Sequence, residues 1–109
     1  MNLAEETFGL SSSVLEQLRT RLARHPKVER AMIFGSRAQG TARPGSDIDI
    51  AIVAPDLSSR EFARLWTELD ELPIAFKMDI VHFDRLTDEH LKAQIVRHGK
   101  TIYSRTEAQ

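Results

Sequence analysis

The sequence contains no cysteine among its 109 residues, which excludes a disulfide framework and a thiolate zinc site. It has no apolar run long enough to span a membrane, and its first residues lack the charged-then-apolar pattern of a secretory signal. Neither sign of charge is in excess, since 15 lysines and arginines stand against 16 aspartates and glutamates. These absences predict a cytoplasmic protein that does not bind long nucleic acids through their phosphates.

The length of the chain also limits what it can contain. With 109 residues, it suits one domain over residues 1–109 and is too short for a separate substrate-binding module. We expect an ordered core over residues 11–103 and a frayed polar tail over residues 104–109. Any large substrate must therefore be held partly by another molecule.

Apolar periodicity predicts a first helix that ends before Pro26. Its apolar stripe consists of Val14, Leu15, Leu18 and Leu22. Two starts are open: Ser11 caps the helix, with Leu10 and Leu15 as a hydrophobic staple, or Ser13 caps it, with Glu16 closing a capping box.

The remaining elements alternate between strands and helices. Residues 28–34, 47–53 and 76–83 predict strands, residues 37–45 a short helical turn with a loop, and residues 58–72 and 87–98 helices. Residues 101–103 leave a short fourth strand open. The helix after Ser58 is predicted to bury Phe62, Leu65, Trp66 and Leu69. This order predicts an α/β protein of the α+β kind, with a small mixed sheet of three to four strands flanked by three to four helices.

Two carboxylates alternate along the second predicted strand. Period two places Ile48, Ile50 and Ile52 on one face, and Asp47, Asp49, Ala51 and Val53 on the other. Aspartate is disfavoured in strands, and like charges this close repel each other unless a cation or a protein donor compensates them. A strand with acids facing water is the ordinary alternative. We interpret Asp47 and Asp49 as ligands of one or two metal ions.

Asp79 is a third acid, inside the otherwise apolar third strand. A short connection requires the first two strands to be antiparallel, whereas a helical connection favours a parallel second pair. Asp79 then approaches Asp47 and Asp49 beside the turn at Gly35. Asp79 is a candidate base for an attacking hydroxyl, or a ligand of a second metal ion.

The turn Gly35-Ser36 follows the first strand directly. Gly35 permits close approach of the backbone to a phosphate, and Ser36 with the N–H groups of the following turn can donate hydrogen bonds to it. A magnesium ion held by the aspartates would bridge the same triphosphate. Arg37 and Arg43 flank this loop, and Arg37 is the stronger candidate for a phosphate contact.

The combined motif resembles the nucleotidyltransferase superfamily that includes DNA polymerase beta. The resemblance consists of Gly35-Ser36, ten intervening residues, Asp47-Ile48-Asp49, and Asp79 in a later strand. Its spacing and small size are similar to the minimal branch, the MNT proteins, which are often paired with a HEPN-domain partner as antitoxins. The resemblance extends from the first predicted strand to Tyr103.

The resemblance implies a nucleotidyltransferase fold and Mg²⁺-dependent transfer of a nucleoside monophosphate, AMP from ATP, to a hydroxyl. It implies an acceptor tyrosine on a HEPN-type toxin in a hetero-oligomer with this chain. Asp47, Asp49 and Asp79 would be the catalytic and metal-binding residues. The nucleotide-binding residues would be Gly35, Ser36, Arg37 and Ser46.

Two other functions fit the sequence. The chain could be a non-catalytic antitoxin that neutralises a partner by binding, in which case Asp79→Asn would leave function intact. It could also transfer a nucleotide to a small molecule of the antibiotic type, although the lack of a second domain in the sequence argues against this.

Overall fold

The computed structural model describes residues 8–43 and 45–105. In chain order the elements are α1 (Ser12–Ala23), β1 (Arg30–Phe34), α2 (Ser36–Gln39), β2 (Ile48–Val53), α3 (Ser59–Asp70), β3 (Met78–His82), a 3₁₀ turn η1 (Phe83–Arg85), α4 (Glu89–His98) and β4 (Lys100–Ser104). The fourth strand, which the sequence left open, is thus present. Among the described helices, none combines the length and the apolar character that crossing a membrane requires.

The four strands form one mixed sheet in the order β3-β2-β1-β4. β1 is antiparallel to both β2 and β4, whereas β2 and β3 are parallel. This arrangement confirms the two strand directions predicted from the connections: the link from β1 to β2 contains only the short helix α2 and a loop, and the link from β2 to β3 contains α3. The mixed α/β fold agrees with the sequence prediction.

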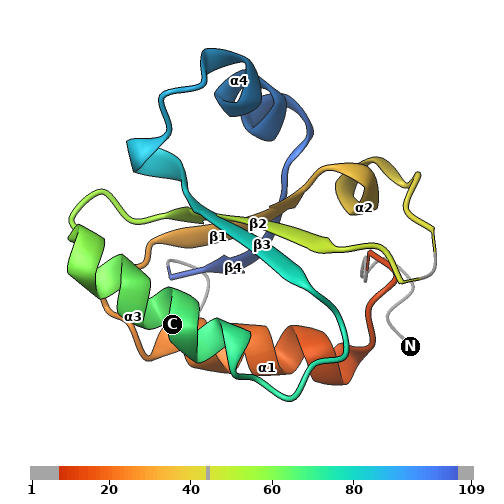
Figure 1. Ribbon diagram of the computed structural model, residues 1–109, viewed down its shortest axis with the longest axis horizontal. Helices are drawn as coiled ribbons and strands as arrows, with labels where there is room; N and C mark the ends of the chain where they lie inside the picture. The colour runs from red at the N-terminus through yellow and green to blue at the C-terminus, as the bar shows by residue number, and fades with distance from the viewer. Residues whose placement is uncertain (1–7, 44, 106–109) are drawn as a thin grey trace.

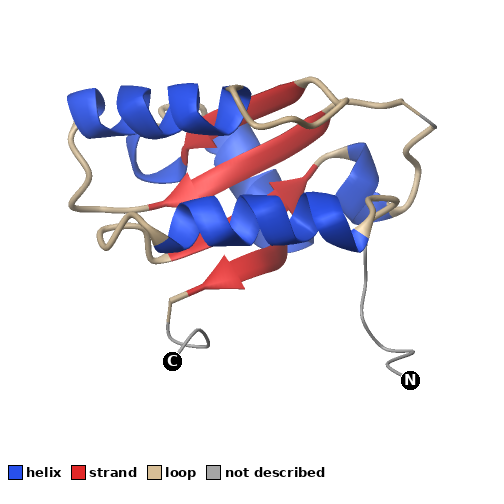
Figure 2. Ribbon diagram, turned by 90° about the horizontal axis from the view of Figure 1, so that it is seen from below, coloured by secondary structure: helices blue, strands red, loops and turns tan. Residues whose placement is uncertain are grey.

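Helices cover the two faces of the sheet unequally. α1 and α3 lie on one face and α4 on the other, while α2 lies beyond the end of β1 (Figure 1). From below, α1 and α3 run side by side across the sheet (Figure 2). Ile48, Ile50 and Ile52 are fully buried in the core formed with α1 and α3. Each buried isoleucine contributes about 1.5–3 kcal/mol to the hydrophobic stabilisation.

The opposite face carries a smaller apolar cluster in which α4 contributes Ile95, above Met32 and Ala51. The face of β2 that was predicted to carry the acids is therefore only partly covered by apolar side chains. Alternation along the strand separates a dry face from a face that carries charge. The active-site candidates consequently lie on the α4 side of the sheet.

The prediction that Trp66 lies in the core is wrong, because its side chain is 40% exposed. Leu65 and Leu69 are fully buried, and the half-buried Phe62 stacks on the His82 ring at a centroid distance of 4.9 Å. These three side chains follow one stripe of α3. Trp66 is turned about 100° away from Leu65, which leaves it at the rim of the interface.

Residues beyond Tyr103 also belong to the fold. Ser104 ends β4, and the N–H of Arg105 donates to the carbonyl of Glu29 at 2.9 Å. The Arg105 guanidinium donates to the carbonyls of Val28 (3.0 Å) and His25 (2.6 Å). The predicted start of the polar tail at residue 104 is therefore too early; residues 106–109 lie outside the described residues.

The caps of the two long core helices are side-chain hydrogen bonds. The Ser11 hydroxyl accepts from the N–H of Val14 at 3.2 Å, which decides between the two predicted starts of α1. At α3, the Ser58 hydroxyl accepts from the N–H of Glu61 (3.1 Å), and the Glu61 carboxylate accepts from the N–H of Ser58 (2.9 Å). The hydrogen bond from the Ser58 backbone, followed by the one from Lys27, lowers the pKa of Glu61 to about 2.

Ser58→Ala should lower the free energy of unfolding by about 1 kcal/mol, because the N–H of Glu61 loses its acceptor. We expect a fall in Tm of about 4–8 °C by circular dichroism. Ser59→Ala, one residue further on and equally exposed, is the control and should change Tm by less than about 2 °C. Equal losses in the two variants would contradict a capping role for Ser58.

Candidate active site

The turn after β1 is built on a glycine in a conformation that other residues avoid. Gly35 has φ +74° and ψ −151°, and α2 begins immediately after it. A Cβ atom added to Gly35 would collide with Oδ2 of Asp49. The absence of a side chain at Gly35 therefore allows the backbone of the turn to lie directly against the carboxylate of β2.

The strand register places the acids at the same end of the sheet, where β2 and β3 begin and β1 ends. Asp49 is opposite Phe34, the last residue of β1, and opposite Asp79 in β3. Asp47 lies one residue before β2 begins. Asp47 and Asp79 are exposed, whereas Asp49 is half-buried between its two neighbouring strands. The register therefore brings Asp49 and Asp79 side by side near the glycine turn, with Asp47 just before β2, while their shared binding of a metal ion stays a prediction.

The three carboxylates influence one another electrostatically. Burial raises the pKa of Asp49, and the negative charges of Asp79 and then Asp47 raise it further. The Arg37 guanidinium opposes these effects and favours the ionised form by lowering the pKa of Asp49. The site therefore holds more negative charge than the nearby protein groups compensate.

The donor set fits a hard divalent cation such as Mg²⁺, which takes oxygen ligands. Within residues 8–43 and 45–105, no three Asp, Glu or His side chains are grouped closely enough to hold a metal ion by themselves. Magnesium is usually held by one or two carboxylates together with substrate phosphates. The geometry thus suits a cation shared with a phosphate ligand, and it offers no complete protein cage.

Ser46 shapes the loop that leads into β2. Its hydroxyl accepts from the N–H of Arg43 at 2.9 Å, and its own N–H donates to the carbonyl of Arg43 at 3.0 Å. This reciprocal pair closes a tight turn two residues before β2. A contact between Ser46 and a nucleotide stays a prediction.

The structure shows Arg37 bonded to the protein backbone, and its predicted phosphate contact stays a prediction. Its side chain is 6% exposed, and its guanidinium donates to the backbone carbonyls of Ser46 (2.7 Å), Phe8 (2.9 Å) and Asp47 (3.3 Å). Three of the five N–H groups of the guanidinium are thus directed at protein acceptors, which holds the side chain in place.

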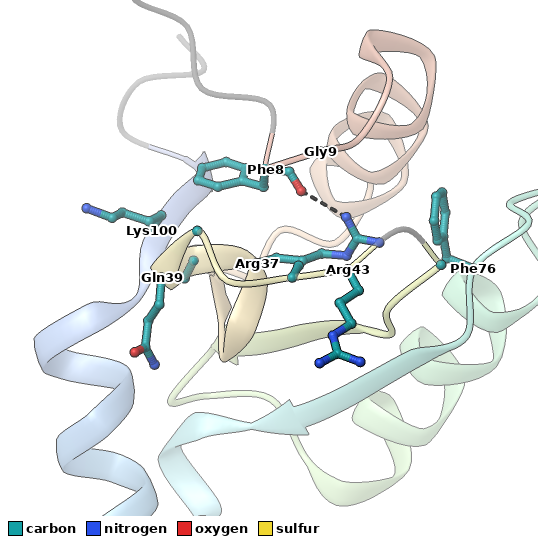
Figure 3. A pocket seen from close by; sticks show the side chains of 11 residues that line it. Phe8, Gly9, Arg37, Gln39, Arg43, Phe76 and Lys100 are labelled. Atoms are coloured by element: carbon teal, nitrogen blue, oxygen red, sulfur yellow. Dashed lines mark hydrogen bonds between the residues drawn. The ribbon is translucent and has the colours of Figure 1, made fainter.

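A cavity of about 760 Å³ adjoins the loop and shares Arg37 with the site. Figure 3 shows Phe8, Arg43, Phe76 and Lys100 around it, with Arg37 directed toward the Phe8 carbonyl and Phe76. None of the three acids lines this cavity. The cavity therefore does not indicate where a triphosphate would bind next to a cation held by the acids.

The far end of β2 is held by side chains that the sequence did not single out for this role. The Asp84 carboxylate accepts from the N–H of Ala54 at 2.7 Å, and Nε2 of the buried His82 donates to the carbonyl of Ala54 at 2.8 Å. Both groups come from the end of β3 and the turn after it. No sequence signal identifies this clamp, because its partner is a backbone group.

The sequence matches the family described as Polymerase beta, Nucleotidyltransferase over residues 16–108. A curated relative, the protein adenylyltransferase MntA of Shewanella oneidensis, is 37% identical over 79 residues. That match covers 72% of this chain and 55% of the relative. The chain thus spans about half the length of the curated relative that it matches.

Solved structures share the fold. One chain in the crystal structure of a toxin–antitoxin with AMP-PNP is 28% identical, with a TM-score of 0.66 over 91% of this chain and 77% of that chain. A chain in the structure of a tri-AMPylated Shewanella oneidensis HEPN toxin in complex with an MNT antitoxin is 23% identical. Its TM-score is 0.64 over 88% of this chain and 74% of that chain, and at this identity it shows the fold alone.

Gly35→Ala should destabilise the protein by about 1–3 kcal/mol and displace the Asp49 carboxylate, because it combines backbone strain with a collision. Gly40→Ala is the matched control: Gly40 has φ +77°, but no atom lies within 4 Å of an added Cβ. Urea unfolding should show a larger loss for Gly35→Ala. Equal losses of stability in the two variants would indicate that backbone strain alone, without the collision with Asp49, explains the need for glycine at position 35.

Asp49→Asn should raise Tm at pH 7 by up to about 4 °C in the absence of a divalent cation, because it removes a partly desolvated charge that Asp47 and Asp79 repel. Since the pKa of Asp49 is raised in the folded state, ionisation of this group lowers stability as the pH increases. The gain in Tm should therefore shrink as the pH falls below that pKa. A variant that melts below the wild type at pH 7 would contradict this account.

Proposed function

Because the chain belongs to the Polymerase beta nucleotidyltransferase family, we propose that it transfers AMP from ATP to the hydroxyl of a protein tyrosine. The acceptor is a HEPN-type toxin that forms a hetero-oligomer with this chain, and modification neutralises the toxin. The observation that supports the proposal is the close approach of the Gly35 turn to the Asp49 carboxylate, because the turn offers backbone N–H groups to a phosphate and the carboxylate offers oxygen ligands to a cation.

The relatives support the choice of nucleotide and partner. The curated relative is named a protein adenylyltransferase, and a 28% identical solved structure is a toxin–antitoxin with AMP-PNP. The site itself is open, because Asp47 and Asp79 are exposed at the edge of the sheet. An open site admits the side chain of a macromolecular acceptor. Since ATP is supplied inside the cell, we also propose a cytoplasmic location for the protein.

Residues of this chain would hold the nucleotide from two sides. Gly35 brings the backbone of the turn close to the triphosphate, and the Ser36 hydroxyl donates a hydrogen bond to it. Asp47 and Asp49 would hold Mg²⁺ together with phosphate oxygens. When bound, Mg²⁺ neutralises the charge that develops on the triphosphate during transfer.

Asp79 is the proposed base that takes the proton from the acceptor hydroxyl. Its position opposite Asp49 in the edge strand β3 leaves it exposed to an approaching hydroxyl. The hydroxyl oxygen forms a bond to the α-phosphorus, and its proton passes to the Asp79 carboxylate. The bond between the α-phosphorus and the bridging oxygen breaks, and pyrophosphate leaves with the electron pair.

Labelled α-phosphate from ATP tests the proposal. The wild-type protein with Mg²⁺ and a lysate of the source cell should label a protein band. The double variant Asp47→Asn/Asp49→Asn should reduce labelling at least about 100-fold, because the cation site is lost. Asp56→Asn/Asp70→Asn is the control for charge: it removes two exposed carboxylates outside the site and should retain labelling.

The pattern of label separates the alternatives. Label on a small molecule alone would replace the protein acceptor with a small-molecule acceptor. Absence of label from folded wild-type protein in the presence of its partner would contradict transfer and leave neutralisation by binding. Asp79→Asn provides a second readout, because catalytic neutralisation of a co-expressed toxin should be lost, whereas neutralisation by binding alone would persist.

A further inference from the structure

Arg37 links the three parts of the candidate site. It follows Ser36 in α2, and its guanidinium donates to the carbonyls of Ser46 and Asp47, where the chain enters β2. The same group lies over the Phe76 ring, with Cζ 4.8 Å from the ring centroid. Phe76 lies two residues before β3 begins. One side chain therefore contacts the entries of both strands that carry the acids.

The environment of Arg37 is built for a guanidinium. The side chain is 6% exposed. Its Nε and its two terminal nitrogens each donate a hydrogen bond to a different backbone carbonyl. Across the described residues, no buried side-chain nitrogen or oxygen lacks a hydrogen-bond partner. A rigid planar fork can serve three acceptors at once, whereas the ammonium of lysine is a point charge on a flexible stem.

Few other interactions tie the loop before β2 to α2. The N–H of Thr41 donates to the carbonyl of Ser36 at 2.9 Å, at the start of the loop. The pair between Arg43 and Ser46 lies within the loop and does not reach α2. In Figure 3 the Arg37 guanidinium faces the Phe8 carbonyl and Phe76, while Arg43 extends away from them. Among the described residues, Arg37 is thus the side chain of α2 that hydrogen-bonds to the end of the loop.

We propose that Arg37 is a positioning residue, which holds the entries of β2 and β3 against α2 so that the three acids face the Gly35-Ser36 turn. The inference rests on the proposed function for its catalytic consequence. Arg37 acts through the backbone of Ser46 and Asp47 and through Phe76, and it does not contact the phosphate. Its charge adds a second effect, because it favours the ionised state of Asp49.

The kinetic consequence differs from that of a phosphate ligand. A misplacement of catalytic groups by about 1 Å can reduce the rate about 100-fold. Loss of a positioning residue should therefore lower kcat, because the acids no longer meet the reacting atoms. Loss of a direct ground-state contact to the triphosphate would mainly raise KM for ATP.

The experiment compares Arg37→Lys, which keeps the charge, with Arg37→Met, which keeps an unbranched apolar stem. Arg60→Met, on the exposed first turn of α3, is the control. Circular dichroism verifies folding, and ATP turnover is measured with the acceptor identified by label transfer. We expect both Arg37 variants to lower kcat about 100-fold with KM for ATP within about threefold, and Arg60→Met to match the wild type. Wild-type kcat in Arg37→Lys, or a raised KM with unchanged kcat, would overturn the proposal.

Hydrogen exchange provides a readout that does not depend on activity. In Arg37→Lys, the amides of residues 45–49 should exchange at least about tenfold faster than in the wild type, while those of α3 stay unchanged. Unchanged exchange over residues 45–49 would overturn the positioning role. An inactive wild type would refute the proposed function, and hydrogen exchange would still decide the role of Arg37.

Phe76→Leu is the second variant, in case Arg37→Met does not fold. It removes the aromatic face under the guanidinium while keeping an apolar side chain. If Arg37 and Phe76 act as one unit, the double variant Arg37→Lys/Phe76→Leu should lose little more kcat than Arg37→Lys alone. Fully multiplicative losses would overturn the link to β3.

Discussion

The contact between Gly35 and Asp49 is the constraint on which the arrangement of the site depends. An added Cβ at Gly35 would meet the Asp49 carboxylate, so a side chain at this position would force that carboxylate away from the turn after β1. The register then places Asp79 beside Asp49 on the other side. The Gly35 turn and the carboxylates of Asp49 and Asp79 therefore lie next to one another.

This arrangement is unfavourable for the isolated fold. Burial and two neighbouring negative charges raise the pKa of Asp49, which means that ionisation of this carboxyl lowers stability. The opposite face of the same strand supplies compensating stability, because Ile48, Ile50 and Ile52 are fully buried between the sheet and the two long helices. Strand alternation allows one segment to be a hydrophobic core on one side and a strained charged site on the other.

Polar side chains fix β2 at both ends. At its entry, the Arg37 guanidinium binds the carbonyls of Ser46 and Asp47. At its exit, Asp84 and His82 hold the N–H and the carbonyl of Ala54. These bonds satisfy backbone groups where the ladder of the sheet ends, and they restrict the strand that carries Asp49. Precise placement of carboxylates requires this restriction, since catalysis is sensitive to errors of about 1 Å.

The sequence by itself determined the order of the elements along the chain, the antiparallel pairing of β1 with β2, the parallel pairing of β2 with β3, and the face of β2 that carries the acids. These follow from local periodicity, cap residues and connection length, all of which act over a few neighbouring residues. Only the tertiary structure decided that Trp66 is exposed and that Arg37 is buried among backbone carbonyls. Both outcomes depend on which segments distant in the chain pack together, and an arginine in a polar loop carries no mark of the carbonyls that it will meet.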